Sequence, residues 1–491
     1  MKNTLISLIC IAMLCACNTK AAASLPRSVP EKEGVSSAGI LKFVEAVEQS
    51  GGEFHSFVVL RHGKVIAESW WNPYHRDFKQ TVYSTSKTFT STAIGFAVSE
   101  NLLSVEDKVV SFFPKEFLPD TISPYLAQLR IKDLLVMSAG DERHSVRMTD
   151  EWVKTFLATP IAFEPGTKFS YNSMATFMLS AIMQQVTGQR LLDYLKPRLF
   201  RPLEMSPDID WEVSPEGINT GGWGIRVRIE DMAKLGQLYL QKGRWNGKQI
   251  LPEAWIAEAT KAHIRQKPDA GAEELATSDW VQGYGYQIWR CRHNGFRADG
   301  AFGQFIIVLP QQDAVVAIQA NYGNMQKEIN LVWDHLLPAM QSKNPLPDDK
   351  MALEKLQNKL NSLTILPPQN KTANVPGNLE RDCRFLRSKN NLSDPSEKYS
   401  IKIVNDTCFL AFNDYPFIFG NEKWLRGETT KPPYNLLPSK GCFREFPPFN
   451  VFGAYAWEND STLIMSLRYI ETPHTEKFIC TFGENGAVIT R

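Results

Sequence analysis

The chain has 491 residues, of which 43% are hydrophobic and 22% are charged, so it has the length of two or three domains and enough apolar content for a large core. The formal net charge of +1 gives no excess that would favour a nucleic acid or another polyanion as a partner. The sequence contains neither a repeat of fixed period nor a cluster with metal-ligand spacing. We therefore expect no solenoid, no metal and no cofactor.

The first residues have the pattern of an export signal. Residues 5–14 form a mostly apolar run that is too short to span a bilayer. The run ends in Leu14-Cys15-Ala16-Cys17, which resembles a bacterial lipobox and implies lipidation at Cys17. Cleavage near Ala21-Ala22-Ala23 is the alternative. In both cases residues 1–24 are expected to be the leader and tether of an exported cell-envelope protein, with membrane contact only through a lipid anchor.

Residues 25–342 are predicted to form one domain with strands at its two ends and helices between them. Small residues on nearly every side of 85–101 predict a helix in the middle of a core. The natural arrangement is an antiparallel sheet flanked by helices, beside a helical lobe, which is an α+β fold with a cleft suited to a ligand. Helices are predicted at about 37–49, 85–101, 174–187, 229–242 and 325–341, and strands at 54–60, 64–71, 284–290, 304–309 and 313–320.

The C-terminal part of the chain differs in pattern. Residues 343–375 are expected to be a linker with a short helix, and 376–491 a small antiparallel sandwich or barrel. Four cysteines in this part could form two disulfides in an exported protein, or remain buried thiols; they are Cys383, Cys408, Cys442 and Cys480. We expect this domain to be dispensable for the chemistry.

The strongest chemical signal is the pair Ser84 and Lys87 at the start of the predicted buried helix. Three residues apart, they lie one turn apart on one helix face. A serine hydroxyl is a weak nucleophile until a base takes its proton, and a lysine withdrawn from water can be neutral and act as that base. Ser84 near a helix N-terminus also favours a developing oxyanion. On this reading, Ser84 is the nucleophile.

Two further stretches could complete such a site. Tyr171-Asn172-Ser173 precedes a predicted helix, and a tyrosine near a lysine can relay a proton to a leaving group. Ser173 could hydrogen-bond the lysine or a substrate carbonyl. Residues 298–304 lead into an apolar strand, where small residues let a substrate approach the strand edge and a backbone N–H could complete an oxyanion hole. Each stretch taken alone would be read as an ordinary turn.

In this order, the three stretches resemble the motifs of the serine β-lactamase and penicillin-binding-protein superfamily. The resemblance covers about 28–342 and is closest to the class C β-lactamase-like branch, with its DD-peptidases, esterases and nylon-oligomer hydrolases. It implies an acylated Ser84, Lys87 as general base and Tyr171 as proton shuttle. It also implies an oxyanion hole formed by the N–H groups of Ser84 and Ala301.

The sequence departs from the family pattern at two places that bear on the substrate. Ser173 stands where the family usually has Asn, and Ala298-Asp299 stand where Lys-Thr is common. The second change removes a cation that holds a substrate carboxylate, and Asp299 would repel such a group. Gly300 and, in a glycine-rich loop, Trp223 complete the predicted substrate-binding set. Arginines that could compensate for the missing cation are Arg226, Arg228 and Arg297.

Two classes of function follow. The first is an exported serine hydrolase that cleaves an ester or amide bond through an acyl-enzyme, with a DD-peptidase or a β-lactamase as alternatives. The second is a non-catalytic binding protein on the same scaffold. The partner is expected to be a small-molecule ester, amide or peptide. Neither HExxH nor G-x-S-x-G occurs, which disfavours a zincin and an α/β-hydrolase.

Overall fold

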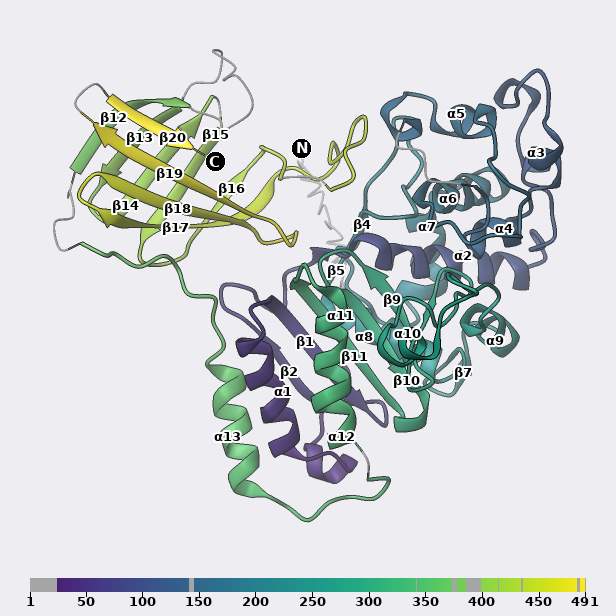
Figure 1. The fold of residues 1–491 in the computed structure, drawn as a ribbon, viewed down its shortest axis with the longest axis horizontal. Coiled ribbons are helices and arrows are strands. Elements are labelled where there is room, and N and C mark those ends of the chain that lie inside the picture. Colours follow the sequence, from purple (N-terminus) through teal and green to yellow (C-terminus); the bar gives the residue numbers. More distant parts are fainter. Residues whose placement is uncertain are drawn as a thin grey trace, which may run out of the picture.

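The structure is a computed structural model that describes residues 24–140, 145–340, 342–372, 378–385, 399–413, 415–433, 436–483 and 486–490. Figure 1 shows a sheet covered by helices, a helical lobe beside it, and a barrel made by the C-terminal strands. The predicted α+β class with an all-β C-terminal part is confirmed. The leader with Cys17 lies outside the described residues.

The central sheet has six antiparallel strands in the order β2-β1-β11-β10-β9-β8. β1 pairs with β11, with Phe57 opposite Ile318, so strands from the two ends of the domain meet in the middle of the sheet. Nearly all residues of β1, β10 and β11 are buried, because other elements cover both faces. The strands are β1 (Glu53–Arg61), β2 (Lys64–Trp70), β8 (Trp289–Arg290), β9 (Phe296–Gly300), β10 (Gln304–Leu309) and β11 (Ala314–Asn321).

Helices that precede and follow the strands of this sheet in the chain cover one of its faces, and α8 (Ile229–Leu240) lies on the other (Figure 1). On the first face, the ring of Phe43 meets that of Phe57 edge-on at 5.6 Å. The short helix expected in the linker is α13, and it packs along α1 with Leu356 and Leu363 buried in the same core. The covering helices are α1 (Ser37–Gln49), α11 (Met325–Leu331), a π-helical turn (Val332–Leu336), α12 (Leu337–Ala339) and α13 (Lys350–Asn361).

The helical lobe is built around α2 (Ser86–Ser99), which is buried on almost every side, as its small residues predict. Gly95 allows the closest approach, because a Cβ there would lie 2.5 Å from the indole nitrogen of Trp255. The other α-helices between the sheet strands are α3 (Pro124–Gln128), α4 (Ile131–Leu135), α5 (Trp152–Ala158), α6 (Ser173–Thr187), α7 (Leu191–Leu195), α9 (Glu253–Thr260) and α10 (Ala272–Thr277).

Short elements complete this part of the chain. They are the strands β3 (Gln80–Thr81), β4 (Asp210–Trp211), β5 (Ile225–Val227), β6 (Arg244–Trp245) and β7 (Lys248–Gln249), the 3₁₀ turns Pro30–Glu33, Tyr83–Thr85, Val109–Phe112, Lys115–Phe117, Val146–Met148 and Pro310–Gln312, and the π-helical turn Lys196–Phe200. In the part of the chain that the structure describes, every helix is too short or too polar to cross a membrane.

The C-terminal strands form a nine-stranded sheet that the pairing of β15 with β17 closes into a barrel. Side chains alternate between the interior and solvent, as in β13, where Tyr399, Ile401 and Ile403 point inward. Cys408 and Cys480 are buried on β14 and β19, and the side chain of Cys383 lies outside the described ones. The strands are β12 (Asn378–Phe385), β13 (Tyr399–Val404), β14 (Thr407–Phe412), β15 (Tyr415–Asn421), β16 (Leu425–Thr429), β17 (Phe449–Asn459), β18 (Thr462–Tyr469), β19 (Thr475–Gly483) and β20 (Gly486–Thr490).

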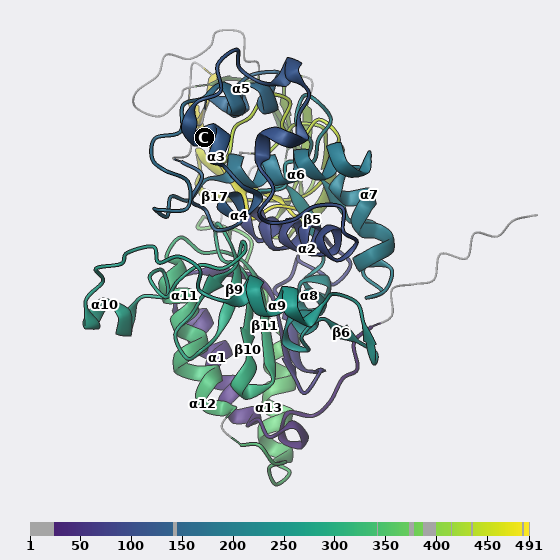
Figure 2. The ribbon, with the colours of Figure 1, turned by 90° about the vertical axis from the view of Figure 1, so that its right-hand side faces the viewer.

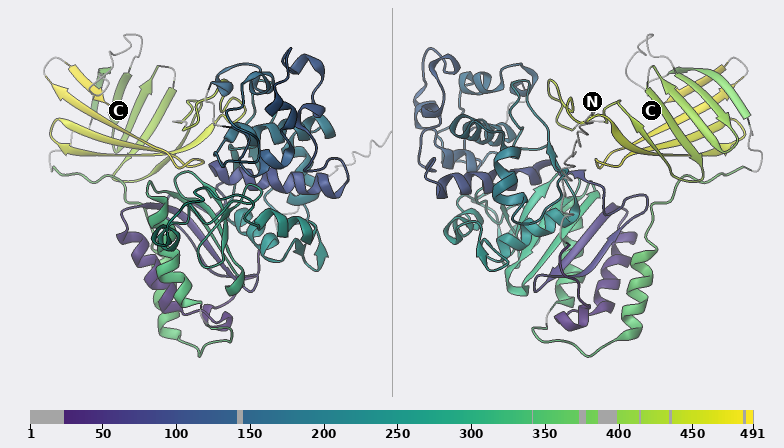
Figure 3. Two further views of the ribbon diagram at one scale, coloured as in Figure 1. Left: turned by 45° about the vertical axis from the view of Figure 1, so that its right-hand side comes forward. Right: turned by 180° about the vertical axis from the view of Figure 1, so that it is seen from behind.

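Among the parts of the barrel that reach the rest of the protein are two of its connections (Figure 3). The connection between β16 and β17 contacts the helical lobe, where Arg147 Nε donates to the Pro438 carbonyl at 3.0 Å. The turn between β18 and β19 lies against β3, where the Thr81 N–H donates to the Glu471 carbonyl at 2.8 Å. Figure 2 shows the barrel strands behind the helical lobe, in line with these contacts.

Candidate active site

Ser84 lies in the 3₁₀ turn that leads from β3 into α2, and Lys87 lies in the first turn of that helix. Lys87 is 1% exposed, while Ser84 is half-buried and reachable from solvent. Lys87 Nζ donates to Ser84 Oγ at 3.0 Å. The structure therefore brings the predicted nucleophile and its predicted base into direct contact, through a lysine that is withdrawn from water.

Lys87 Nζ is held by two further groups from other parts of the chain. It donates to Ser173 Oγ at 3.1 Å and to the Gly222 carbonyl at 2.7 Å. Gly222 belongs to the glycine-rich loop noticed in the sequence, and a Cβ there would lie 2.8 Å from the Ser173 carbonyl. Three acceptors thus fix the amine in one position beside the serine hydroxyl.

In the stretch Tyr171–Ser173, one residue caps a helix and the other two lie beside Lys87. Asn172 caps α6, because its Oδ1 accepts from the Met174 and Ala175 N–H groups. Ser173 follows it and takes the contact with the lysine. The Tyr171 ring lies over the Lys87 amine, 4.8 Å from centroid to Nζ, and stacks on Trp289 at 5.7 Å. Tyr171 and Ser173 are therefore both beside Lys87.

The third stretch forms the end of β9 and the turn into β10, and it lies directly against the segment before Ser84. A Cβ at Gly300 would be 2.2 Å from the Val82 carbonyl, so only glycine allows this approach. Thr85 Oγ1 also donates to the Gln304 carbonyl at 2.6 Å. These contacts hold the strand edge that carries Ala301 beside the helix that begins at Ser84.

Asp299 does not act as an exposed negative charge. Its carboxylate accepts from Arg297 Nε at 2.7 Å, and both side chains are buried. Burial raises the pKa of Asp299, and Arg297 opposes this rise. Arg297 itself lies over the rings of Trp280 and Trp289, with centroid distances of 4.5 and 5.4 Å. The ion pair thus packs against two tryptophan rings.

The arginines considered as replacements for the family lysine all have acidic partners. Arg297 is paired with Asp299, Arg226 bonds Asp210 and Glu471, and Arg228 bonds Asp77 and Asp208. A substrate carboxylate would therefore have to compete with a protein carboxylate at each of these three positions.

Trp223 is not the pocket wall that the sequence suggested. Its side chain is 2% exposed, packs on Trp152 with ring centroids 5.9 Å apart, and donates to Glu212 Oε1 at 3.3 Å. The reason is local: the Gly222 carbonyl turns toward Lys87, while the adjacent tryptophan fills the lobe core. Burial raises the pKa of Glu212 to about 7, against its contacts with Trp223 and Ser439.

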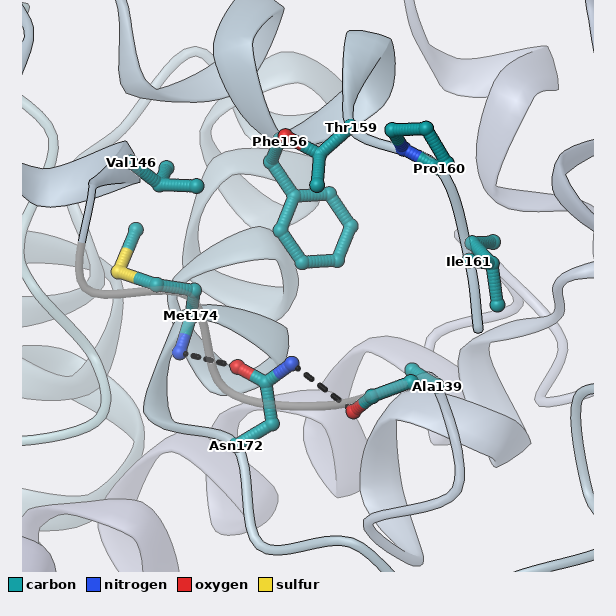
Figure 4. Close-up of a pocket in the computed structure, with 9 residues that line it drawn as sticks. Ala139, Val146, Phe156, Thr159, Pro160, Ile161, Asn172 and Met174 are labelled. Carbon is teal, nitrogen blue, oxygen red and sulfur yellow. Dashed lines mark hydrogen bonds between the residues drawn. The ribbon is translucent and has the colours of Figure 1, made fainter. Parts of the chain in front are cut away.

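A small apolar pocket lies behind the Tyr171–Ser173 stretch (Figure 4). Asn172 points into it and donates to the Gly140 carbonyl at 3.2 Å. Phe156, Ile161 and Met174 are among the other lining residues. Its free volume of about 20 Å³ is close to that of one water molecule, so the pocket is too small for a substrate group.

Sequence reasoning missed one group beside the site. His474, from the turn between β18 and β19 of the barrel, hydrogen-bonds through Nε2 with the hydroxyl of Tyr83, the neighbour of Ser84. Its ring also meets that of Phe302, the neighbour of Ala301, at 5.2 Å. No local motif marks His474, because its role depends on how a distant domain docks.

The described residues include no group of three or more His, Cys, Asp or Glu side chains arranged to hold a metal ion. The antiparallel sheet, the helical lobe and the Ser84–Lys87 pair at their junction define a serine hydrolase. The chain belongs to the Beta-lactamase family, whose profile matches residues 44–336.

Individual relatives agree with this assignment. The chain is 23% identical to a 6-aminohexanoate-dimer hydrolase of Paenarthrobacter ureafaciens over 282 residues, which are 53% of this chain and 71% of the relative. Among solved structures, EstCE1, a hydrolase with promiscuous acyltransferase activity, aligns with a TM-score of 0.50 and 18% identity, over 62% of this chain and 99% of its own. A penicillin-binding protein homologue from Caulobacter crescentus aligns with a TM-score of 0.51 and 15% identity, over 65% and 100% of the two chains. These structures share the fold.

Proposed function

We propose that the protein hydrolyses an ester or amide that has no carboxylate beside the scissile bond, through an acyl-enzyme on Ser84. The observation that carries this proposal is the contact of Lys87 Nζ with Ser84 Oγ at 3.0 Å, made by a lysine with 1% exposure. A nucleophile and a base in direct contact are the minimum equipment for covalent catalysis by serine. A binding protein would need neither the contact nor the withdrawal of the amine from water.

In the proposed reaction, Lys87 in its neutral form takes the Ser84 proton as Oγ attacks the carbonyl carbon. The oxyanion of the tetrahedral intermediate accepts hydrogen bonds from the N–H groups of Ser84 and Ala301. Tyr171 passes the proton to the leaving alcohol or amine, which departs as the carbonyl reforms on Ser84. Water then attacks the acyl-enzyme by the same steps, which releases the acid and restores the serine hydroxyl.

The charge and shape around Ser84 favour a substrate without a carboxylate next to the scissile bond. The acidic partners of Arg226, Arg228 and Arg297 already occupy these three cations. Trp289 and Tyr171 offer an aromatic surface on the lysine side. This combination favours an esterase or amidase over a β-lactamase or DD-peptidase, and the Paenarthrobacter relative is named as a hydrolase of the 6-aminohexanoate dimer.

The test of the proposal is labelling with a fluorophosphonate probe. Wild-type protein should be labelled at Ser84 as mapped by peptide mass, and the Ser84→Ala variant should not be labelled. Hydrolysis of p-nitrophenyl acetate measured beside hydrolysis of nitrocefin ranks ester cleavage against lactam cleavage. A wild-type protein that is folded but resists the probe would favour the non-catalytic binding protein instead.

We also propose that the protein is exported and anchored through a lipid on Cys17, on the strength of the apolar run and the lipobox-like residues 14–17. Incorporation of labelled palmitate into the wild type but not into Cys17→Ala would support the anchor. Equal incorporation would place the lipid on a residue other than Cys17, and none in either protein would favour ordinary cleavage near residues 21–23.

A further inference from the structure

The turn between β18 and β19 brings the barrel to the segment that immediately precedes the nucleophile. The Thr81 N–H donates to the Glu471 carbonyl at 2.8 Å, and the Glu471 carboxylate receives Arg226 Nη1 at 3.2 Å. On β18, Arg468 forms a bidentate salt bridge with Glu53 of β1, with N···O distances of 2.6 and 2.7 Å. A charge-assisted contact of this kind fixes geometry as well as adding energy. The turn is therefore firmly seated beside Ser84.

His474 stands at the end of this turn and touches the neighbours of both predicted oxyanion donors. Its Nε2 hydrogen-bonds with the hydroxyl of Tyr83, which precedes Ser84. Its ring meets those of Tyr83 and Phe302 edge-on, with centroids 5.9 and 5.2 Å apart, and Phe302 follows Ala301. Tyr83 and Phe302 also contact each other at 5.5 Å. A single side chain of the barrel thus contacts the residues next to both predicted oxyanion donors.

The backbone at both neighbours needs such support. Tyr83 has a φ of 46° and Phe302 a φ of 63°, in the left-handed region that residues with a Cβ rarely adopt. Strained conformations persist only where surrounding contacts hold them. The peptide plane that carries the Ser84 N–H begins at Tyr83, so the conformation of Tyr83 helps to set the direction of that donor.

His474 is suited to accept a hydrogen bond from the Tyr83 hydroxyl. Burial lowers its pKa to about 4, so the ring is neutral at physiological pH and one ring nitrogen can accept a hydrogen bond. Thr472 Oγ1 accepts from the His474 N–H at 3.1 Å, and the Tyr469 N–H donates to the His474 carbonyl at 3.1 Å. The turn thereby fixes the histidine backbone as well.

We propose that His474 is a positioning residue of the active site, which holds Tyr83 and Phe302 so that the N–H groups of Ser84 and Ala301 point at the developing oxyanion. The inference rests on the proposed acyl-enzyme function. It also replaces the expectation that the C-terminal domain is dispensable for the chemistry: the barrel supplies no reacting group, but it completes the support of the donors.

The experiment compares the full-length variants His474→Ala, His474→Gln and Tyr83→Phe with wild type. The readouts are the acylation rate in the p-nitrophenyl acetate burst, kcat and KM, and the rate of fluorophosphonate labelling. Lys440→Ala is the matched control, because it removes the barrel's exposed ion pair with Asp150 on the helical lobe. Each variant's cooperative unfolding is measured by circular dichroism.

We expect His474→Ala to acylate at least tenfold more slowly with KM changed less than twofold. Tyr83→Phe loses only the hydrogen bond, and its acylation rate should also decrease. The rate of His474→Gln should lie between those of His474→Ala and wild type. The rate of Lys440→Ala should equal that of wild type. If His474→Ala does not fold, Tyr83→Phe decides. Rates in Tyr83→Phe and His474→Ala equal to wild type, or a loss reproduced by Lys440→Ala, would overturn the role of His474. Failure of the probe to label wild-type Ser84 would instead overturn the proposed function.

Discussion

Replacement of Lys87 by alanine should abolish rapid acylation of Ser84 and leave the protein folded. The amine that contacts Ser84 Oγ at 3.0 Å is lost, and a positioned base contributes about 10²- to 10⁴-fold to the rate. This range corresponds to about 3–5 kcal/mol of activation free energy. We expect a rate loss in the upper half of this range, because Lys87 is 1% exposed and bulk water has little access to the space it leaves.

The same substitution has a smaller cost in stability. Ser173 Oγ and the Gly222 carbonyl each lose a donor, and a buried polar group without its partner costs about 1–3 kcal/mol. Removal of a buried amine offsets part of this cost. Lys87→Met keeps most of the side-chain volume and serves as the control for the cavity, so a loss of rate shared by both variants belongs to the amine.

The assay is the stopped-flow burst of p-nitrophenol from p-nitrophenyl acetate, with circular dichroism to establish folding. The reasoning would be refuted by a folded Lys87→Ala protein whose burst rate lies within threefold of wild type. In that case another group must take the serine proton, and the contact between Lys87 and Ser84 would be structural.

Three further substitutions test the support of the site and of the fold. Gly300→Ala should reduce acylation at least tenfold, because its Cβ would lie 2.2 Å from the Val82 carbonyl, whereas Gly323→Ala, with open space around it, should not. Glu212→Gln should be more stable than wild type at pH 8 by up to about 3 kcal/mol and no more stable at pH 4. The reason is that the pKa of Glu212 is raised from 4.5 to about 7 in the folded state, so the fold favours the protonated carboxyl. This preference stabilises the fold at low pH, and the stabilisation is lost as the pH rises from 4.5 through 7. Leu356→Ala should lower the free energy of unfolding by about 2–4 kcal/mol in urea titrations, because this leucine is 1% exposed in the core between α13 and the sheet.

Each of these expectations has a contrary result. A fully active Gly300→Ala enzyme would mean that the β9–β10 turn moves without harm to the oxyanion hole. A stability difference for Glu212→Gln that is the same at pH 4 and pH 8 would show that the carboxyl does not titrate as inferred. A loss below 1 kcal/mol for Leu356→Ala would show that α13 contributes little to the core.

The parts of the fold that local patterns determine could be predicted from the sequence. Small residues at 85–101 indicated the central helix α2, and the β-rich runs at both ends of the domain indicated the sheet in which β1 meets β11. The contact of Lys87 with Ser84 follows from helical spacing alone. That Ser173 would contact the lysine was among the expectations, because the turn before α6 was recognised.

What could not be predicted depends on long-range packing. The spacing of Leu356 and Leu363 is the same for a linker helix and for one packed on α1, so the sequence pattern cannot distinguish them. Trp223 follows the glycine whose carbonyl receives the lysine, yet its own side chain turns into the lobe core. His474 carries no motif, and only the docking of the barrel brings it to Tyr83.

The position of β1 in the sheet has a consequence for how the protein acquires its structure. Residue 57 finds its register partner only at residue 318, after the whole helical lobe has been synthesised. Until then β1 and the hairpin it forms with β2 present an unpaired apolar edge, of the kind that aggregates most readily. Pairings between distant segments also slow folding, since a long loop must close before the contact is gained. The same strand order that places the nucleophile beside the sheet therefore favours slow folding, with this hairpin exposed until β11 has been made.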